Sequence, residues 1–186
     1  MENLKKLVKD TLYQEDIQID DLPALDLYVD QLLMLIEDKS EDKKRQKSDK
    51  ILTKTMINNY SKEGLIFPAK GKKYTQEHIL QILMILSMKN TLSLTDIKMV
   101  MQNVTQREDY STESLKMCYN TYLSLKNHAR DSVIEVIENV VDLYDIQPDD
   151  KNKLLLLILC FTSMADEMKR LSELMIDCYF KDEEKK

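Results

Sequence analysis

Residues 53–75 read TKTMINNYSKEGLIFPAKGKKYT, and this stretch decides the fold that we expect. Apolar side chains recur at helical spacing in Ile51–Glu63, and Gly64 follows at once, as glycine often does just past the end of a helix. Residues 65–74 contain Pro68 and Gly71 and predict two very short extended pieces around a turn, the one place where β structure is expected. The stretch therefore predicts a helix followed by a minimal two-stranded wing.

The predicted helix has one apolar and one polar face. At about 100° per residue, Met56, Ile57 and Tyr60 share one arc, while amides, a hydroxyl and ammonium groups share the other. Asparagine suits adenine edges in the major groove, and lysine suits phosphate or guanine. Three further lysines lie on the turn that follows, which is the plan of a recognition helix with a basic wing. The candidate DNA-binding residues are Lys54, Thr55, Asn58, Asn59, Lys62, Lys70, Lys72 and Lys73.

Helices are expected on both sides of this stretch. One covers Glu2–Tyr13, and Asp21 with Pro23 opens another that ends at Asp38. The apolar run Leu154–Phe161 predicts a helix that is central in a bundle. The remaining expected helices are Gln76–Lys89 with Thr75 as its cap, a helix from Ser93 to about Gln102, Thr112–Tyr144 with a break near Asn127, and Lys151–Phe180.

The expected fold class is all-α with a small wing. Two glycines and three prolines in 186 residues argue against folds that need many tight turns, such as β-sandwiches and propellers. We expect a winged helix-turn-helix domain over residues 20–104. Residues 105–186 then form a helical region for dimerisation or sensing, with residues 1–19 packing on it.

Charge is strongly segregated along the chain. Residues 39–73 contain eleven basic and four acidic side chains, a net of +7, so the remaining residues, with 16 basic and 29 acidic side chains, carry −13. The net charge of −6 and the pI of about 5.1 are not typical of a nucleic-acid binder, but the basic block attracts polyanions. Residues 39–50 contain no apolar side chain, so a solvated linker is the alternative interpretation of that segment.

Sequence signals for catalysis and cofactors are nearly absent. Two glycines cannot build a dinucleotide- or phosphate-binding loop, no HExxH motif is present, and His78 and His128 are isolated. We expect His78, in the first turn after Thr75, to be open to solvent or to the wing. The acidic pairs at 20–21 and 149–150 fit helix N-termini better than a metal site. No enzyme activity, metal or cofactor is therefore expected.

The cysteines and the apolar runs indicate a cytoplasmic protein. Cys118, Cys160 and Cys178 form no CxxC pair, and each is expected to pack as a small core residue in a reducing compartment. No apolar segment typical of a secretion signal follows the charged N-terminus. The longest apolar run, residues 154–161, is far shorter than the roughly 20 residues of a spanning helix.

The order of these motifs resembles the DNA-binding domain of the MerR family. That family combines a Ser/Thr helix start, a Leu-Arg-Tyr-Tyr-Glu helix, Gly-Leu-Leu, a proline, a basic wing ending in tyrosine and a later Ser-Leu-x-x-Ile; the similar stretches here are 53–68, 72–75 and 92–97. The arginine that contacts the DNA backbone in that family falls on Asn58, and a wing tyrosine and arginine fall on Gly71 and Lys72. The whole chain is also similar to the bacterial YkrK-type proteins of unknown function, which implies a fold but no activity.

Two hypotheses of function follow. The first is a bacterial transcriptional regulator of MerR-like type that binds double-stranded DNA as a homodimer, since one short helix reads few bases, and that responds to an unknown small-molecule effector. The second is a helical protein–protein interaction module whose winged fold does not bind DNA. The overall acidity and the missing helix arginine favour the second hypothesis.

Overall fold

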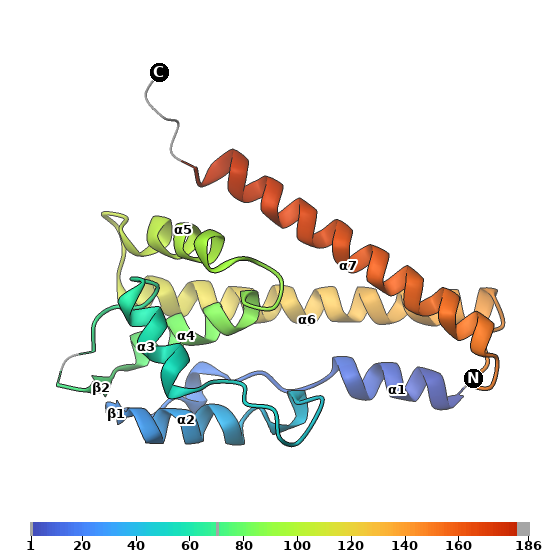
Figure 1. Ribbon diagram of the computed structural model, residues 1–186, viewed down its shortest axis with the longest axis horizontal. Helices are drawn as coiled ribbons and strands as arrows, with labels where there is room; N and C mark the ends of the chain where they lie inside the picture. The colour runs from blue at the N-terminus through green and yellow to red at the C-terminus, as the bar shows by residue number, and fades with distance from the viewer. Residues whose placement is uncertain (1, 70, 182–186) are drawn as a thin grey trace. The chain divides into compact units, whose positions relative to one another are not determined.

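A computed structural model describes residues 2–69 and 71–181 and shows a mostly helical protein with a small two-stranded sheet (Figure 1). Two short 3₁₀ turns, η1 (Ile19–Asp21) and η2 (Glu41–Lys43), flank α2 in sequence. The helices are α1 (Glu2–Leu12), α2 (Val29–Asp38), α3 (Lys54–Lys62), α4 (Gln76–Met88), α5 (Leu94–Thr105), α6 (Thr112–Leu143) and α7 (Lys151–Tyr179), and the strands are β1 (Leu27–Tyr28) and β2 (Lys73–Tyr74).

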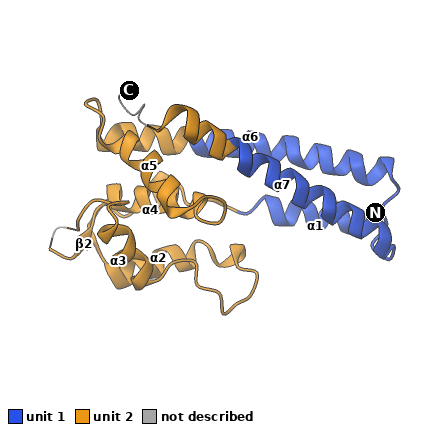
Figure 2. Ribbon diagram, turned by 45° about the horizontal axis from the view of Figure 1, so that its top comes forward, with its two compact units in different colours: residues 1–14, 122–171 blue, residues 15–121, 172–186 orange. Residues whose placement is uncertain are grey.

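The chain divides into two compact units, coloured separately in Figure 2. Unit 1 comprises residues 1–14 and 122–171, and unit 2 comprises residues 15–121 and 172–186. In unit 1, α1 packs beside α6 and α7 around buried Ile137, Val141 and Leu157. Lys5 pairs with Asp142 at 2.7 Å, which holds α1 on α6. Unit 1 is therefore a small helical bundle with a core of its own.

Helix α4 forms the centre of unit 2. Its buried side chains face almost every direction, because α2, α3 and α5 each contribute buried residues to the same core. A helix that is apolar nearly all round is typical of such a central position. The fully buried side chains of α4 are Ile79, Leu80, Gln81, Ile82 and Ile85.

The sheet differs from the predicted wing. Strand β2 pairs antiparallel with β1, placing Leu27 opposite Tyr74, so one strand comes from upstream of α2 and the prediction of two strands within 65–74 was wrong. Residues 65–67 are engaged elsewhere: Leu65 N donates to Tyr60 O at 2.8 Å, and Phe67 N donates to the Gln81 side chain at 3.0 Å. Pro68, which lacks an N–H, then prevents a continuous ladder.

The start of α2 also corrects a sequence prediction. The helix begins at Val29 and not at Pro23, because Leu27 and Tyr28 are extended and paired in the sheet. Asp21 caps the η1 turn instead, where its carboxylate accepts from Gln18 N at 2.8 Å. The side-chain amide of Gln76 donates to Pro23 O at 3.1 Å, and this bond holds the segment between η1 and β1 on α4.

The two long helices correct three further predictions. Helix α6 is continuous, with no break near Asn127, since that residue tolerates an exposed helical position. The run 154–161 is not enclosed by this chain: Leu157 is buried, whereas Leu155 and Leu156 are 54% and 63% exposed. The three cysteines, predicted to be core residues, are all exposed because they lie on outward faces of α6 and α7.

Candidate nucleic-acid interface

Local sequence explains how α3 forms and how it is held. The Thr53 hydroxyl accepts from Met56 N at 3.2 Å and caps the first turn. Ile57 and Tyr60, three residues apart, are buried inside unit 2. Gly64 ends the helix with a φ of +71°, a left-handed conformation that residues with a Cβ adopt at a cost. Helix α3 is therefore fixed at both ends and along one side.

The opposite side of α3 is open, as the sequence predicts. All five predicted contact residues of the helix are exposed, and their side chains make no hydrogen bond or ion pair with another residue that the structure describes. The helix itself carries no acidic side chain. This α3 face, made of Lys54, Thr55, Asn58, Asn59 and Lys62, offers donors and positive charge in the pattern that DNA grooves accept.

The turn after α3 adds more positive charge. Gly71 and Lys72 have φ values of +60° and +63°, so the chain reverses sharply before β2. Lys72 and Lys73 are exposed, whereas Lys70, the third predicted lysine of the turn, lies outside the described residues. Lys73 Nζ lies 5.5 Å from the ring centroid of Tyr28, a cation–π contact.

Tyr28 is a candidate contact residue that sequence reasoning missed. It is 54% exposed and stands opposite Lys73 in the sheet, although 45 positions separate them along the chain. Its phenol offers a donor beside the basic turn. Tyr28 lies in the two-residue strand Leu27-Tyr28, and two residues are too few for a strand to be predicted from the sequence.

A half-buried polar cluster around buried Gln81 holds the loop before the turn. Phe67 N donates to Gln81 Oε1, and the Phe67 ring meets Tyr110 edge to face with centroids 5.8 Å apart. The Tyr110 hydroxyl donates to Glu77 at 2.5 Å and also hydrogen-bonds with Gln81. Burial, followed by the Glu77 carboxylate, raises the pKa of Tyr110 well above its usual range. The loop is thus tied to the central helix of unit 2.

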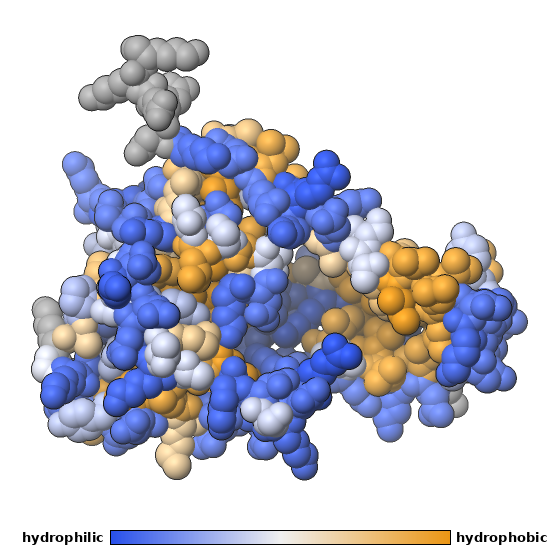
Figure 3. Space-filling model, viewed as in Figure 1, coloured by the Kyte–Doolittle hydropathy of each residue, from blue (hydrophilic) through white to orange (hydrophobic). Residues whose placement is uncertain are grey.

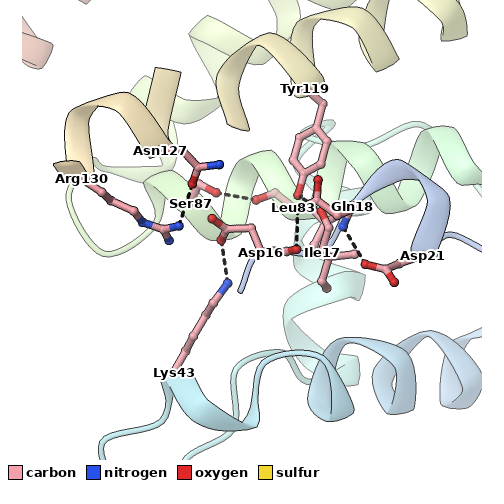
Figure 4. Close-up of polar contacts among 10 residues, drawn as sticks. All are labelled: Asp16, Ile17, Gln18, Asp21, Lys43, Leu83, Ser87, Tyr119, Asn127 and Arg130. Atoms are coloured by element: carbon pink, nitrogen blue, oxygen red, sulfur yellow. Dashed lines mark hydrogen bonds and ion pairs between the residues drawn. The ribbon is translucent and has the colours of Figure 1, made fainter. Parts of the chain in front are cut away.

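Most basic side chains of the 39–50 linker form ion pairs within the protein. Lys39 pairs with Asp21 at 2.6 Å and Lys43 with Asp16 at 2.7 Å, and Lys44 and Lys50 both pair with Glu37. Figure 4 shows Lys43 reaching Asp16, next to the bond from the Tyr119 hydroxyl to Ile17 O.

These ion pairs lower the pKa values of two acidic partners of the linker. The hydrogen bond from Lys39 lowers the pKa of Asp21, and the one from Lys44 lowers the pKa of Glu37. The basic linker therefore fastens itself to α2 and η1. Within the basic block 39–73, the exposed lysines that form no ion pair with a described residue include Lys54 and Lys62 of the α3 face and Lys72 of the turn, and Arg45 and Lys47 are the linker cations without one.

A second hollow in unit 2 is less suited to a polyanion. This cavity of about 780 Å³ lies beside α5, and its basic lining residues are Lys98, Arg107 and Lys181. Arg107 already pairs with Asp109 at 2.9 Å, and Lys181 with Asp177 at 2.5 Å. Because internal acids oppose two of its three cations, the cavity carries less free charge than the α3 face.

The histidine at the start of α4 is structural in this arrangement. His78 is 4% exposed, which corrects the prediction of an open position. Its Nδ1 accepts from Thr75 N at 3.2 Å, completing a reciprocal cap, and Tyr74 covers the ring edge to face at 5.8 Å. Capping turns the imidazole inward over the helix end, so it is not presented to a ligand. Within the described part of the chain, no cluster of three potential metal ligands occurs.

None of the helices in residues 2–69 and 71–181 has the length and apolar content needed to cross a membrane.

Comparison with known proteins gives one family. Neither the curated proteins nor the solved structures contain a match to this chain. Residues 17–122, more than half of the chain, match the family described as a domain of unknown function, DUF1836. The matched range contains α2, α3, the turn, α4, α5 and both strands, and so includes every residue of the α3 face and the turn. The chain therefore belongs to the DUF1836 family.

Proposed function

We propose that this protein binds double-stranded DNA and regulates transcription, with the α3 face in the major groove and the basic turn on the phosphate backbone. Asn58 and Asn59 are then placed to read base edges, and Lys72 and Lys73 to position the protein on the backbone. The protein acts as a homodimer, because a helix of nine residues reaches few base pairs and two half-sites give useful specificity.

One observation carries this proposal. The lysines and amides of the α3 face pair with no other described residue, whereas four lysines of the 39–50 linker form ion pairs within the protein. The chain pairs four linker lysines with three acids, Asp16, Asp21 and Glu37, yet leaves Lys54, Lys62 and Lys72 without an internal partner among the described residues. Exposed lysines that lack internal acids can displace the counterions condensed on DNA phosphates, and the release of these counterions favours binding.

The test is fluorescence anisotropy of the full chain on labelled duplex DNA over a series of salt concentrations. Four cations, Lys54, Lys62, Lys72 and Lys73, predict a slope of log affinity against log salt of about −3.6 for each protomer, at about −0.9 per phosphate contact. The double variant Lys72→Glu/Lys73→Glu removes two contacts, so the slope becomes shallower by about 1.8 and affinity at low salt falls at least tenfold.

The matched control is Lys6→Glu/Lys151→Glu, which changes the net charge equally at exposed positions of unit 1. It is expected to bind DNA within about threefold of the wild type, because neither lysine belongs to the α3 face or the turn. Equal losses in both variants indicate a general charge effect and count against the α3 face. Absence of binding by the wild type at low salt overturns the proposal.

A second candidate function rests on a groove next to the α3 face. Leu33, Met34 and Leu52 line a hollow of about 370 Å³ between α2 and the start of α3, and Met34 is 67% exposed. An apolar groove of this kind suits a partner protein. Binding through it depends little on salt, so the same salt series separates a protein-interaction module from a DNA-binding one.

A further inference from the structure

We propose that unit 1 pairs with unit 1 of a second copy of this chain, through apolar faces of α6 and α7 that one copy leaves uncovered. The inference names the surface that forms the homodimer of the proposed function, and it rests on observations in unit 1 that are independent of DNA binding. Two α6–α7 hairpins then build one antiparallel four-helix bundle.

Helix α7 has two apolar faces where a helix at the edge of a small bundle needs one. Leu154, Leu157 and Phe161 point into the core of unit 1. Leu155, Ile158 and Leu159, spaced by three and four positions, lie about a third of a turn away and are 54%, 58% and 55% exposed.

Charge is absent from this part of α7. Residues 154–165 contain no charged side chain, so nothing on the second face favours water over an apolar neighbour. A helix with polar flanks only at its ends is typical of a position between other helices.

Helix α6 contributes a matching stripe. Ala129, Val133, Val136, Val140 and Leu143 recur at alternating spacings of four and three, the repeat by which helices pack along a seam. Val136 is 48% exposed and Leu143 is 78% exposed, while Val140 lies partly against the core. Figure 3 shows apolar side chains gathered over the part of unit 1 in which α6 ends and α7 begins.

The uncovered apolar surface of unit 1 is shared by two helices. Leu155, Leu156, Ile158 and Leu159 are 54–63% exposed, so each leaves more than half of its surface in water. The α6 stripe adds several similar side chains. Exposed apolar side chains that gather on two adjacent helices mark an interaction surface, and a standard interface buries roughly 800 Å² of such surface per partner.

The chemistry of the surface selects a second copy and not a lipid surface. Helices that lie on anionic membranes carry lysine and arginine beside their apolar face. Unit 1 has nine basic and eleven acidic residues, a net of −2, which gives no attraction to such lipids. The α6–α7 faces also lack a charge pattern that specifies a different protein, whereas like apolar faces are complementary to themselves around a two-fold axis.

The experiment measures the mass of the full chain by light scattering after size exclusion, over a hundredfold range of concentration. The wild type is expected to run at twice the mass of one chain. The variant Leu155→Gln/Leu159→Gln is expected to run at the mass of one chain at 10 μM, corresponding to at least a hundredfold weaker dimer, with an unchanged far-ultraviolet circular dichroism spectrum. The spectrum distinguishes loss of the dimer from loss of folding.

A control and a second test make the result specific. Leu25→Gln changes an 81% exposed leucine of unit 2 and is expected to leave the dimer intact. The variant Val136→Gln is a second test, on α6: it is expected to weaken the dimer, and an unchanged dimer would contradict the assignment of the α6 stripe to the interface.

A wild type that has the mass of one chain at every concentration overturns the inference. A Leu155→Gln/Leu159→Gln variant that remains dimeric overturns it as well. Neither outcome decides whether the α3 face binds DNA, because the two sets of variants change different surfaces. The Lys72→Glu/Lys73→Glu variant is expected to dimerise normally.

Discussion

Replacing Gln81 with methionine is expected to loosen the loop that carries the basic turn. Methionine keeps the length and unbranched shape of the side chain, but its thioether is only a weak acceptor and cannot replace the amide as the partner of Phe67 N and Tyr110. Gln81 is 1% exposed, so water cannot replace the lost partners at that position. A buried donor left without a partner costs about 1–3 kcal/mol, and this is the expected loss in the free energy of unfolding.

Two measurements check this prediction. Urea unfolding followed by circular dichroism gives the loss of stability, with Gln106→Met as the control, since Gln106 is exposed and its replacement is expected to change stability by less than about 0.5 kcal/mol. Hydrogen exchange of the Phe67 amide reports the contact itself, and exchange is expected to accelerate at least tenfold in the Gln81→Met variant.

The reasoning is refuted if Gln81→Met stays within about 0.5 kcal/mol of the wild type and the Phe67 amide keeps its protection. That result would mean that the loop is fixed by the Phe67–Tyr110 ring contact and by its neighbours, and that the Gln81 hydrogen bonds contribute little.

Two further predictions concern the end of α3 and the alkaline limit of stability. Gly64→Ala is expected to cost about 1–2 kcal/mol in urea unfolding, because φ is +71° while the added Cβ would meet Gln102 at an ordinary 3.6 Å; an unchanged stability would contradict the strain argument. Burial raises the pKa values of Tyr60, Tyr74 and Tyr110 in the folded state, so their full contribution to stability holds below pH 10 and falls as the pH rises above it, because the unfolded chain loses these protons first. Unfolding free energies measured between about pH 8 and 11 are expected to show no loss from these tyrosines below pH 10 and a decline above it, less steep in Tyr110→Phe; equal slopes would refute this assignment for Tyr110.

The sequence by itself determined the helices and the polar α3 face. Capping residues such as Thr53, Thr75 and Ser93, the stop at Gly64 and the apolar spacing act over three or four residues, so they can be recognised without knowledge of the fold. The same local periodicity predicted that Asn58, Asn59 and the flanking lysines face outward, as they do.

Only the tertiary structure decided which distant residues meet. The pairing of Leu27 with Tyr74, the capture of linker lysines by Asp16, Asp21 and Glu37, and the placement of Tyr28 beside Lys73 depend on chain segments that fold together across long loops. Charge counts along the sequence treat every lysine alike, whereas a lysine that pairs internally has little attraction left for a polyanion. Likewise, an apolar run in the sequence indicates a surface that avoids water. Only the packing of the helices decides whether the same chain covers that surface.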